Sequence, residues 1–117
     1  MASKTFSVTN YALNVGYKNS ATWGGVNIQI QGYVACYGDD GSRLIVYGLH
    51  PTSPVPAAPV YNVSGNVGAI FIPFSELHDY VDVVRNEKPV YARLDSDHPE
   101  WMSLSTGKEP AGEEEAT

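Results

Sequence analysis

Residues 26–37 read VNIQIQGYVACY, and apolar and polar side chains alternate along them. One side of the alternation holds Val26, Ile28, Ile30, Gly32, Val34 and Cys36. A period of two is that of a β-strand with one buried face. The turn sequence Asp39-Asp40-Gly41 follows, and residues 43–49 then supply a second β-rich run. A short Asp/Gly turn between two such runs predicts a β-hairpin.

The segment before this hairpin predicts a strand that changes direction. In residues 5–17 the apolar positions are even-numbered as far as Val8 and odd-numbered from Tyr11 onward. A strand can absorb such a slip only through a bulge or a bend, which we expect near Thr9 and Asn10. Strands that pass from one sheet to another behave in this way. The glycines and small polar residues of positions 18–25 predict a loop before the next strand.

The segment after the hairpin contains the only helical pattern. Four prolines within residues 50–59 exclude a helix or a central strand and predict a stiff surface loop. Short strands are expected at residues 60–63 and 67–72. An apolar stripe at helical spacing then predicts a helix over residues 75–86, with Ser75 as its N-cap. A last hairpin is expected from residues 90–95 and 101–106, around a turn at residues 96–99.

This order of elements predicts an all-β, or β-rich α+β, fold. We expect a small bent antiparallel barrel or sandwich of about six to seven strands, with one helix at about residues 75–86. An OB-type barrel, whose helix lies between its third and fourth strands, is similar in element order, and so are many β-sandwiches. Residues 1–107 are expected to form a single domain and residues 108–117 an acidic C-terminal tail.

Composition limits the classes of partner. The 117 residues suffice for one domain with one core. Half of the formal net charge of −6 belongs to the tail, which has one lysine and four glutamates, and the body is therefore only mildly acidic. This balance disfavours duplex DNA and anionic membranes as partners. No apolar run is long enough to span a membrane, and the first residues lack the apolar segment of a secretory signal, so we expect a cytoplasmic protein.

No residue pattern indicates catalysis. Cys36 is the single cysteine, and its position on the apolar side of its strand favours a buried thiol over a nucleophile. Neither a nucleophile elbow nor a phosphate-binding glycine loop occurs, so we expect no enzyme activity and no cofactor. Asp95, Asp97 and His98 are weak candidates for a metal site. A tight turn, in which the carboxylates accept local backbone N–H groups, is the stronger interpretation of these three residues.

The polar side of residues 26–37 is the candidate binding surface, and it carries Asn27, Gln29, Gln31, Tyr33 and Tyr37. Amides hydrogen-bond in two directions, and tyrosine offers a flat apolar face with a hydroxyl group. Such a strip could be an ordinary solvated face, an interface with a protein partner or a second copy, or a face for a single strand of nucleic acid or a sugar. We expect a non-enzymatic interaction module that self-associates through exposed tyrosine-rich β-surface. The alternatives are a single-stranded nucleic-acid-binding OB-type barrel with an acidic tail, and a small-ligand or sugar-binding β-domain.

Overall fold

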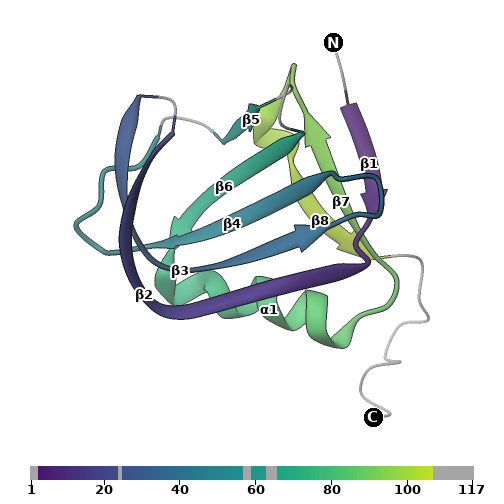
Figure 1. Cartoon of the computed structure of the whole chain (residues 1–117), viewed down its shortest axis with the longest axis horizontal. Helices are drawn as coiled ribbons and strands as arrows, with labels where there is room; N and C mark the ends of the chain where they lie inside the picture. Colours follow the sequence, from purple (N-terminus) through teal and green to yellow (C-terminus); the bar gives the residue numbers. More distant parts are fainter. Residues whose placement is uncertain (1–2, 24, 57–58, 63–65, 107–117) are drawn as a thin grey trace.

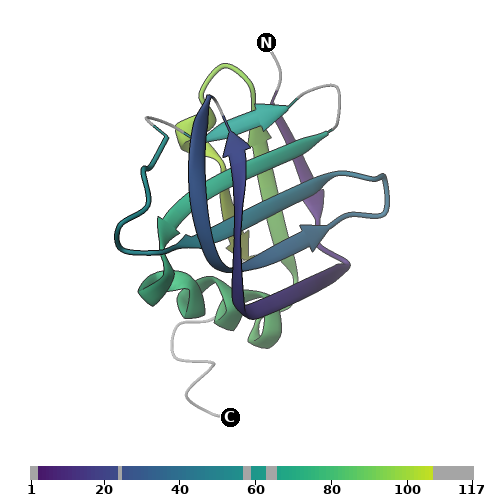
Figure 2. The ribbon, with the colours of Figure 1, turned by 60° about the vertical axis from the view of Figure 1, so that its left-hand side comes forward.

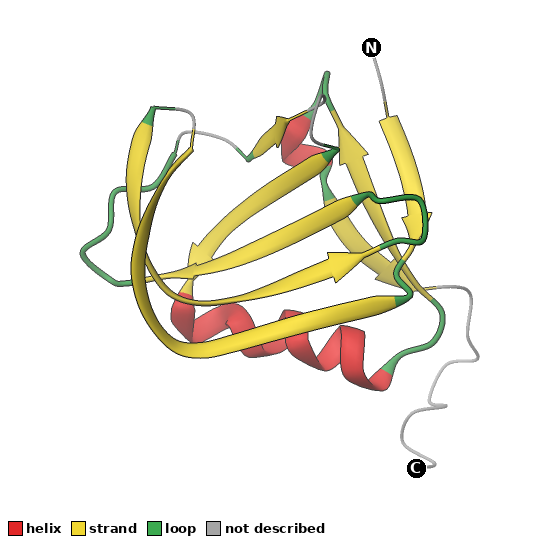
Figure 3. Cartoon of the chain, in the orientation of Figure 1, coloured by secondary structure: helices red, strands yellow, loops and turns green. Residues whose placement is uncertain are grey.

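The computed structural model describes residues 3–23, 25–56, 59–62 and 66–106. These residues form two β-sheets and one α-helix (Figures 1 and 3). One sheet has three strands in the order β1-β7-β8, and the other has five in the order β2-β3-β4-β6-β5. The β-rich class with a single helix is therefore confirmed. In chain order the elements are β1 Ser3–Ser7, β2 Asn10–Trp23, β3 Val26–Tyr37, β4 Arg43–Leu49, β5 Val60–Asn62, β6 Val67–Pro73, a 3-10 turn Phe74–Glu76, α1 Leu77–Asn86, β7 Val90–Asp95, a 3-10 turn Pro99–Trp101 and β8 Ser103–Thr106.

The predicted change of direction is the place where the chain crosses between the sheets. β1 pairs antiparallel with β7, whereas β2 pairs antiparallel with β3. Val8 and Thr9 lie between β1 and β2 and shift the alternation of buried side chains by one position. The first long strand of the sequence is thus two strands, which brings the total among the described residues to eight.

The prediction of a loop over residues 18–25 is wrong, because β2 continues to Trp23. Asn19 pairs with Ile30, and Trp23 pairs with Val26. A register shift between Val15 and Asn19, next to Gly16 with its φ of 85°, takes up the irregular part of the sequence within the ladder. Figure 2 shows the result: the far half of the β2–β3 hairpin curls across the five-stranded sheet.

The β3–β4 hairpin is confirmed with the predicted bounds of both strands. Gly41 has a φ of 87° in the connecting turn, a backbone conformation that favours glycine. The sheet is not antiparallel throughout, however, because β4 and β6 are parallel. Parallel neighbours need a crossover connection, which the proline-rich segment and β5 provide here.

The helix begins later than predicted. A 3-10 turn occupies residues 74–76, and α1 begins at Leu77 with Glu76 at its N-cap, so Ser75 lies inside the 3-10 turn and is not the N-cap of α1. Leu77 and Val81 are buried where α1 packs against β3 and β4. The helix lies close to the sheet because Gly32 and Gly48 present no side chains there: a Cβ on Gly32 would come within 2.8 Å of the Phe74 ring.

Two apolar clusters lie on opposite faces of the five-stranded sheet. On its inner face, side chains of both sheets and of α1 form the main core, which includes Phe6, Val34, Cys36, Leu44, Val46, Ile70, Leu77, Val81, Ala92, Leu94 and Met102. On its outer face, the curled part of the β2–β3 hairpin covers a smaller cluster built on Ile28, Ile30 and Leu49.

The last hairpin is present, but β8 begins at Ser103 rather than at residue 101, because Pro99 to Trp101 form a 3-10 turn. The predicted acidic tail, residues 108–117, lies outside the described residues. Within the described part of the chain, no helix is both long enough and apolar enough to cross a membrane.

Candidate functional site

The predicted binding strip of β3 does not form a single surface. Ile30 pairs with Leu49 and Gly32 pairs with Gly48, so Gln31 is an extra residue in the β3–β4 ladder. A bulge of this kind reverses which side of the sheet the following residues face. In a regular strand Tyr33 would face the side of the sheet opposite to Ile28 and Ile30. Because of the bulge, it faces the same side and packs with them in the outer cluster.

The remaining residues of the strip fall into different surroundings. Asn27 and Gln29 are exposed, whereas Gln31 and Tyr37 are half-buried. Tyr37 pairs with Asn10 and Arg43 at the other end of β3. The structure brings Gln29 and Gln31 together at one cavity, with Asn19 and His50, but not with the two tyrosines.

Tyr33 belongs to an aromatic cluster of four rings on the outer face, with Trp23, Tyr47 and Phe71. The Tyr47 and Phe71 rings are stacked, with centroids 6.0 Å apart and an angle of 9° between their planes. Trp23 lies 6.1 Å from Tyr47 and 6.4 Å from Phe71, and Tyr33 lies 6.2 Å from Tyr47. These rings pack against one another beneath the hairpin, and this holds its curled half to the sheet.

The free edge of the five-stranded sheet carries an apolar surface that the sequence alone did not single out. β2 is the outermost strand on one side, and Tyr11, Leu13 and Val15 are 40%, 42% and 60% exposed. They share the inner face of the sheet, since Tyr11 pairs with Cys36 and Leu13 with Val34. Because α1 packs against β3 and β4, the apolar side of β2 extends beyond the helix. We call Tyr11, Leu13 and Val15 the β2 edge.

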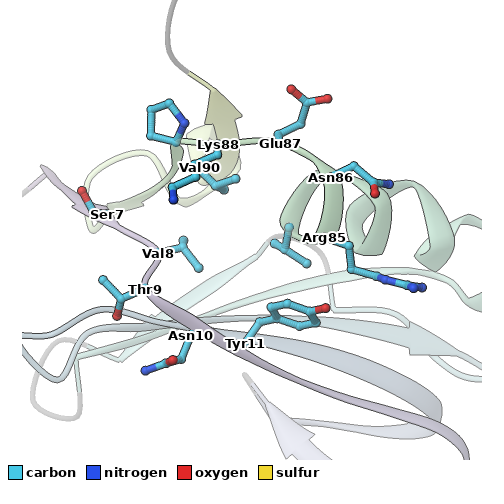
Figure 4. A pocket seen from close by; sticks show the side chains of 12 residues that line it. Ser7, Val8, Thr9, Asn10, Tyr11, Arg85, Asn86, Glu87, Lys88 and Val90 are labelled. Atoms are coloured by element: carbon cyan, nitrogen blue, oxygen red, sulfur yellow. The ribbon is translucent and has the colours of Figure 1, made fainter. Parts of the chain in front are cut away.

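An open cavity of about 290 Å³ separates the β2 edge from α1. Its lining contains no charged side chain and consists of Leu13, Val15, Phe74, Ser75, Leu77, His78 and Val81. A second cavity, of about 550 Å³, follows toward the end of α1 (Figure 4). There Val8 and Tyr11 face a segment that carries Arg85 and Lys88. The apolar side chains of the β2 edge thus line one cavity with Leu77 and Val81, and Tyr11 also lines a second cavity that includes charged side chains.

Cys36 lies in the main core, as its position on the apolar side of residues 26–37 predicts. Cys36 is fully buried, and burial raises the pKa of its thiol to about 12. A thiol with so high a pKa has almost no thiolate at neutral pH, and the thiolate is the reactive form. The surroundings of Cys36 are those of a core residue.

The Asp95 carboxylate makes the local contacts of a turn. Its Oδ1 accepts the backbone N–H groups of Asp97 at 3.0 Å and His98 at 2.8 Å, and its Oδ2 accepts a hydrogen bond from Arg93 at 2.9 Å. The His98 N–H is the main cause of a lowered pKa at Asp95, helped by Arg93 and the Asp97 N–H. The described residues hold no group of three or more side chains placed to bind a metal ion.

The side chain of His98 contacts Trp101 and Glu100. Its ring stacks on Trp101 at 3.9 Å between centroids, and its Nδ1 lies 3.3 Å from a carboxylate oxygen of Glu100. Arg93 also lies over the Trp101 ring, at 5.4 Å from its centroid. Asp95 and His98 are therefore parts of a packed turn that closes the β7–β8 hairpin.

A single strand of nucleic acid would need several cations beside the tyrosines of β3. Lys4 instead forms an ion pair with Asp40 at 2.8 Å, and Arg93 with Asp95 at 2.9 Å. Arg85 and Lys88 line the cavity at the end of α1, which neither Tyr33 nor Tyr37 lines. Arg43 is the cation that pairs directly with Tyr37. This distribution gives the nucleic-acid alternative little support.

No protein-family model, curated protein or solved structure matches this chain significantly.

Proposed function

We propose that this protein is a non-enzymatic interaction module that self-associates through the β2 edge. The observation that carries the proposal is the exposure of three large apolar side chains in a row on the outermost strand of a sheet. Edge strands normally avoid pairing with other chains through charged residues, prolines or short length. β2 is 14 residues long, contains no proline and has Lys18 as its single charged residue.

A second copy of the chain is the partner that fits this edge most simply. Two β2 strands related by a two-fold axis would pair antiparallel and join the two sheets into one. The irregular part of β2 begins after Val15, so residues 10–15 are the regular segment for such pairing. The inner faces of the two sheets lie on the same side of the joined sheet only when odd-numbered residues of one β2 strand pair with odd-numbered residues of the other. Pairing centred on Leu13 meets this condition and sets Tyr11 opposite Val15 of the second copy.

This register also accounts for the cavity between the β2 edge and α1. Leu13 would meet Leu13 of the second copy at the axis, and an aromatic side chain opposite a β-branched one is a favourable cross-strand pair. The two α1 helices would lie on the same side of the joined sheet. Apolar side chains near the axis would then fill the cavity that Leu13 and Val15 share with Leu77 and Val81.

The substitution Leu13→Lys tests the proposal. It sets two cations opposite each other at the axis, where like charges destabilise a cross-strand pair. Val55→Lys is the matched control, because Val55 is 61% exposed and belongs to the proline-rich segment between β4 and β5, outside residues 10–15. Both substitutions fall on exposed side chains and should change the free energy of unfolding by at most about 0.5 kcal/mol.

Molar mass is the quantity to measure, by light scattering after size-exclusion chromatography at high micromolar concentration. The wild-type protein and Val55→Lys should have twice the chain mass of 12.7 kDa, and Leu13→Lys should have the chain mass. A wild-type protein that stays at the chain mass, or a Leu13→Lys variant that still dimerises, would contradict the proposal.

A further inference from the structure

Three segments that are distant in sequence meet around His50: the far half of β2 at Asn19, β3 at Gln29 to Gln31, and the start of the proline-rich segment. The backbone N–H of His50 donates to the carbonyl of Gln29 at 3.0 Å, and the N–H of Gln29 donates to the Ser53 hydroxyl at 2.8 Å. The N–H of Ser53 donates in turn to the His50 carbonyl at 2.9 Å. The start of the proline-rich segment is thus fixed to the curled part of β3.

His50 lies between two cavities of different character. One, of about 340 Å³, is lined by Asn19, Gln29, Ile30, Gln31 and His50, so that neutral hydrogen-bonding groups prevail. The other, of about 150 Å³, is mostly apolar and is lined by Leu49, His50, Pro51, Ser53, Val55, Phe71, Ile72 and Pro73. Neither lining contains a charged side chain, which sets these cavities apart from the one beside Arg85 and Lys88.

The contacts of His50 fix which of its ring nitrogens can donate. The backbone N–H of Thr52 donates to Nδ1 at 3.1 Å, and the Thr52 hydroxyl lies 2.8 Å from the same atom. Nδ1 is therefore an acceptor, and the neutral ring carries its proton on Nε2. The Nε2–H group adds a donor to the amide groups of Gln29 and Gln31, which can both donate and accept.

We propose that the two cavities flanking His50 form one binding site for an uncharged small molecule that is polar at one end and apolar at the other. The hydroxyl or carbonyl groups of the ligand would bind Gln29, Gln31 and His50, and its apolar end would pack against Leu49 and Phe71. Small-ligand sites commonly combine an apolar wall with a few polar groups that fix orientation, in a space of about 300–1,000 Å³. This inference is independent of self-association, since the site includes no residue of the β2 edge.

An aryl glycoside has both required ends, and phenyl β-D-glucopyranoside is the probe for the test. In an NMR titration of ¹⁵N-labelled protein, the side-chain amide signals of Gln29 and Gln31 should shift and saturate. Gln31→Ala should weaken binding about three- to tenfold, as expected for the loss of one hydrogen bond. Asn27→Ala is the matched control, since Asn27 is an exposed amide on the same strand that lines neither cavity. It should bind as the wild type does.

Three results would overturn the inference. They are the absence of saturable shifts with the glycoside, equal affinity of the wild type and Gln31→Ala, and equal or tighter binding of phenyl phosphate, which carries charge in place of the sugar. The thermal unfolding midpoint of Gln31→Ala should match that of Asn27→Ala, so that a loss of binding cannot reflect a loss of fold.

Discussion

At the scale of single residues, Asp95 is the polar group most closely tied to the fold. It is buried, and two backbone N–H groups and Arg93 satisfy its carboxylate. The sequence indicated this turn, because closely spaced aspartates followed by proline favour one. Ser75 is the predicted helix N-cap, but it lies in a 3-10 turn that precedes the helix. The spacing of apolar residues that predicts a helix does not show that its first residues form a 3-10 turn.

Acid should destabilise the protein through its carboxylates. Contacts of the folded state lower the pKa of Asp95, chiefly the His98 N–H, and the pKa of Asp40 to about 2, chiefly the hydrogen bond from Lys4. The unfolded carboxylates, with pKa values near ~3.9, then bind protons at a higher pH than the folded ones do. The free energy of unfolding should therefore fall as the pH drops below about 4.

The variant Asp95→Asn isolates one of these two groups. It keeps a side-chain oxygen for the turn and loses the charge, so it should be less stable at neutral pH and should lose part of the acid dependence. Urea unfolding at neutral pH and at several acidic pH values measures both effects. An Asp95→Asn protein with the acid dependence of the wild type would show that the Asp95 contacts contribute nothing to it.

At the scale of elements, close approach between α1 and the sheet depends on glycine. A Cβ at Gly32 would lie 2.8 Å from the Asn14 carbonyl oxygen and 2.8 Å from a Phe74 ring carbon, so the variant Gly32→Ala should displace the 3-10 turn and the helix. Overpacking of this kind costs about 1–3 kcal/mol of stability. Urea unfolding should show that loss, whereas Asn27→Ala on the exposed side of the same strand should stay within about 0.5 kcal/mol of the wild type. An unchanged midpoint for Gly32→Ala would contradict the packing described here.

The elements that could be predicted are those with regular alternation. β3, β4 and β7 have the predicted bounds, because their buried and exposed residues alternate or their turns carry clear signals. The bulge at Gln31 could not be predicted, since it depends on the register with β4 rather than on β3 itself. That single residue separates Tyr33 from Gln29 and Gln31 and so divides the predicted binding strip. The cluster of Trp23, Tyr47 and Phe71 depends in the same way on the parallel pairing of β4 with β6.

At the scale of the whole molecule, the sheet order determines which surface is left for a partner. The β2 edge is apolar because it continues the main core, and it is exposed because α1 lies farther in, under β3 and β4. The sequence indicated that tyrosine-rich β-surface would be exposed, but it could not identify β2 as an outermost strand. A second copy of the chain would cover this exposed apolar edge.

Amide hydrogen exchange, followed residue by residue at low and high protein concentration, tests self-association through the β2 edge. Backbone N–H groups of residues 10–15 that point away from β3 should exchange more slowly as the concentration rises, because a second β2 strand would accept their hydrogen bonds. The opposite edge of the same sheet, β5, is an internal control whose exchange should not depend on concentration. Exchange in residues 10–15 that is equally fast at both concentrations, or slowed at β5 instead, would contradict self-association through the β2 edge.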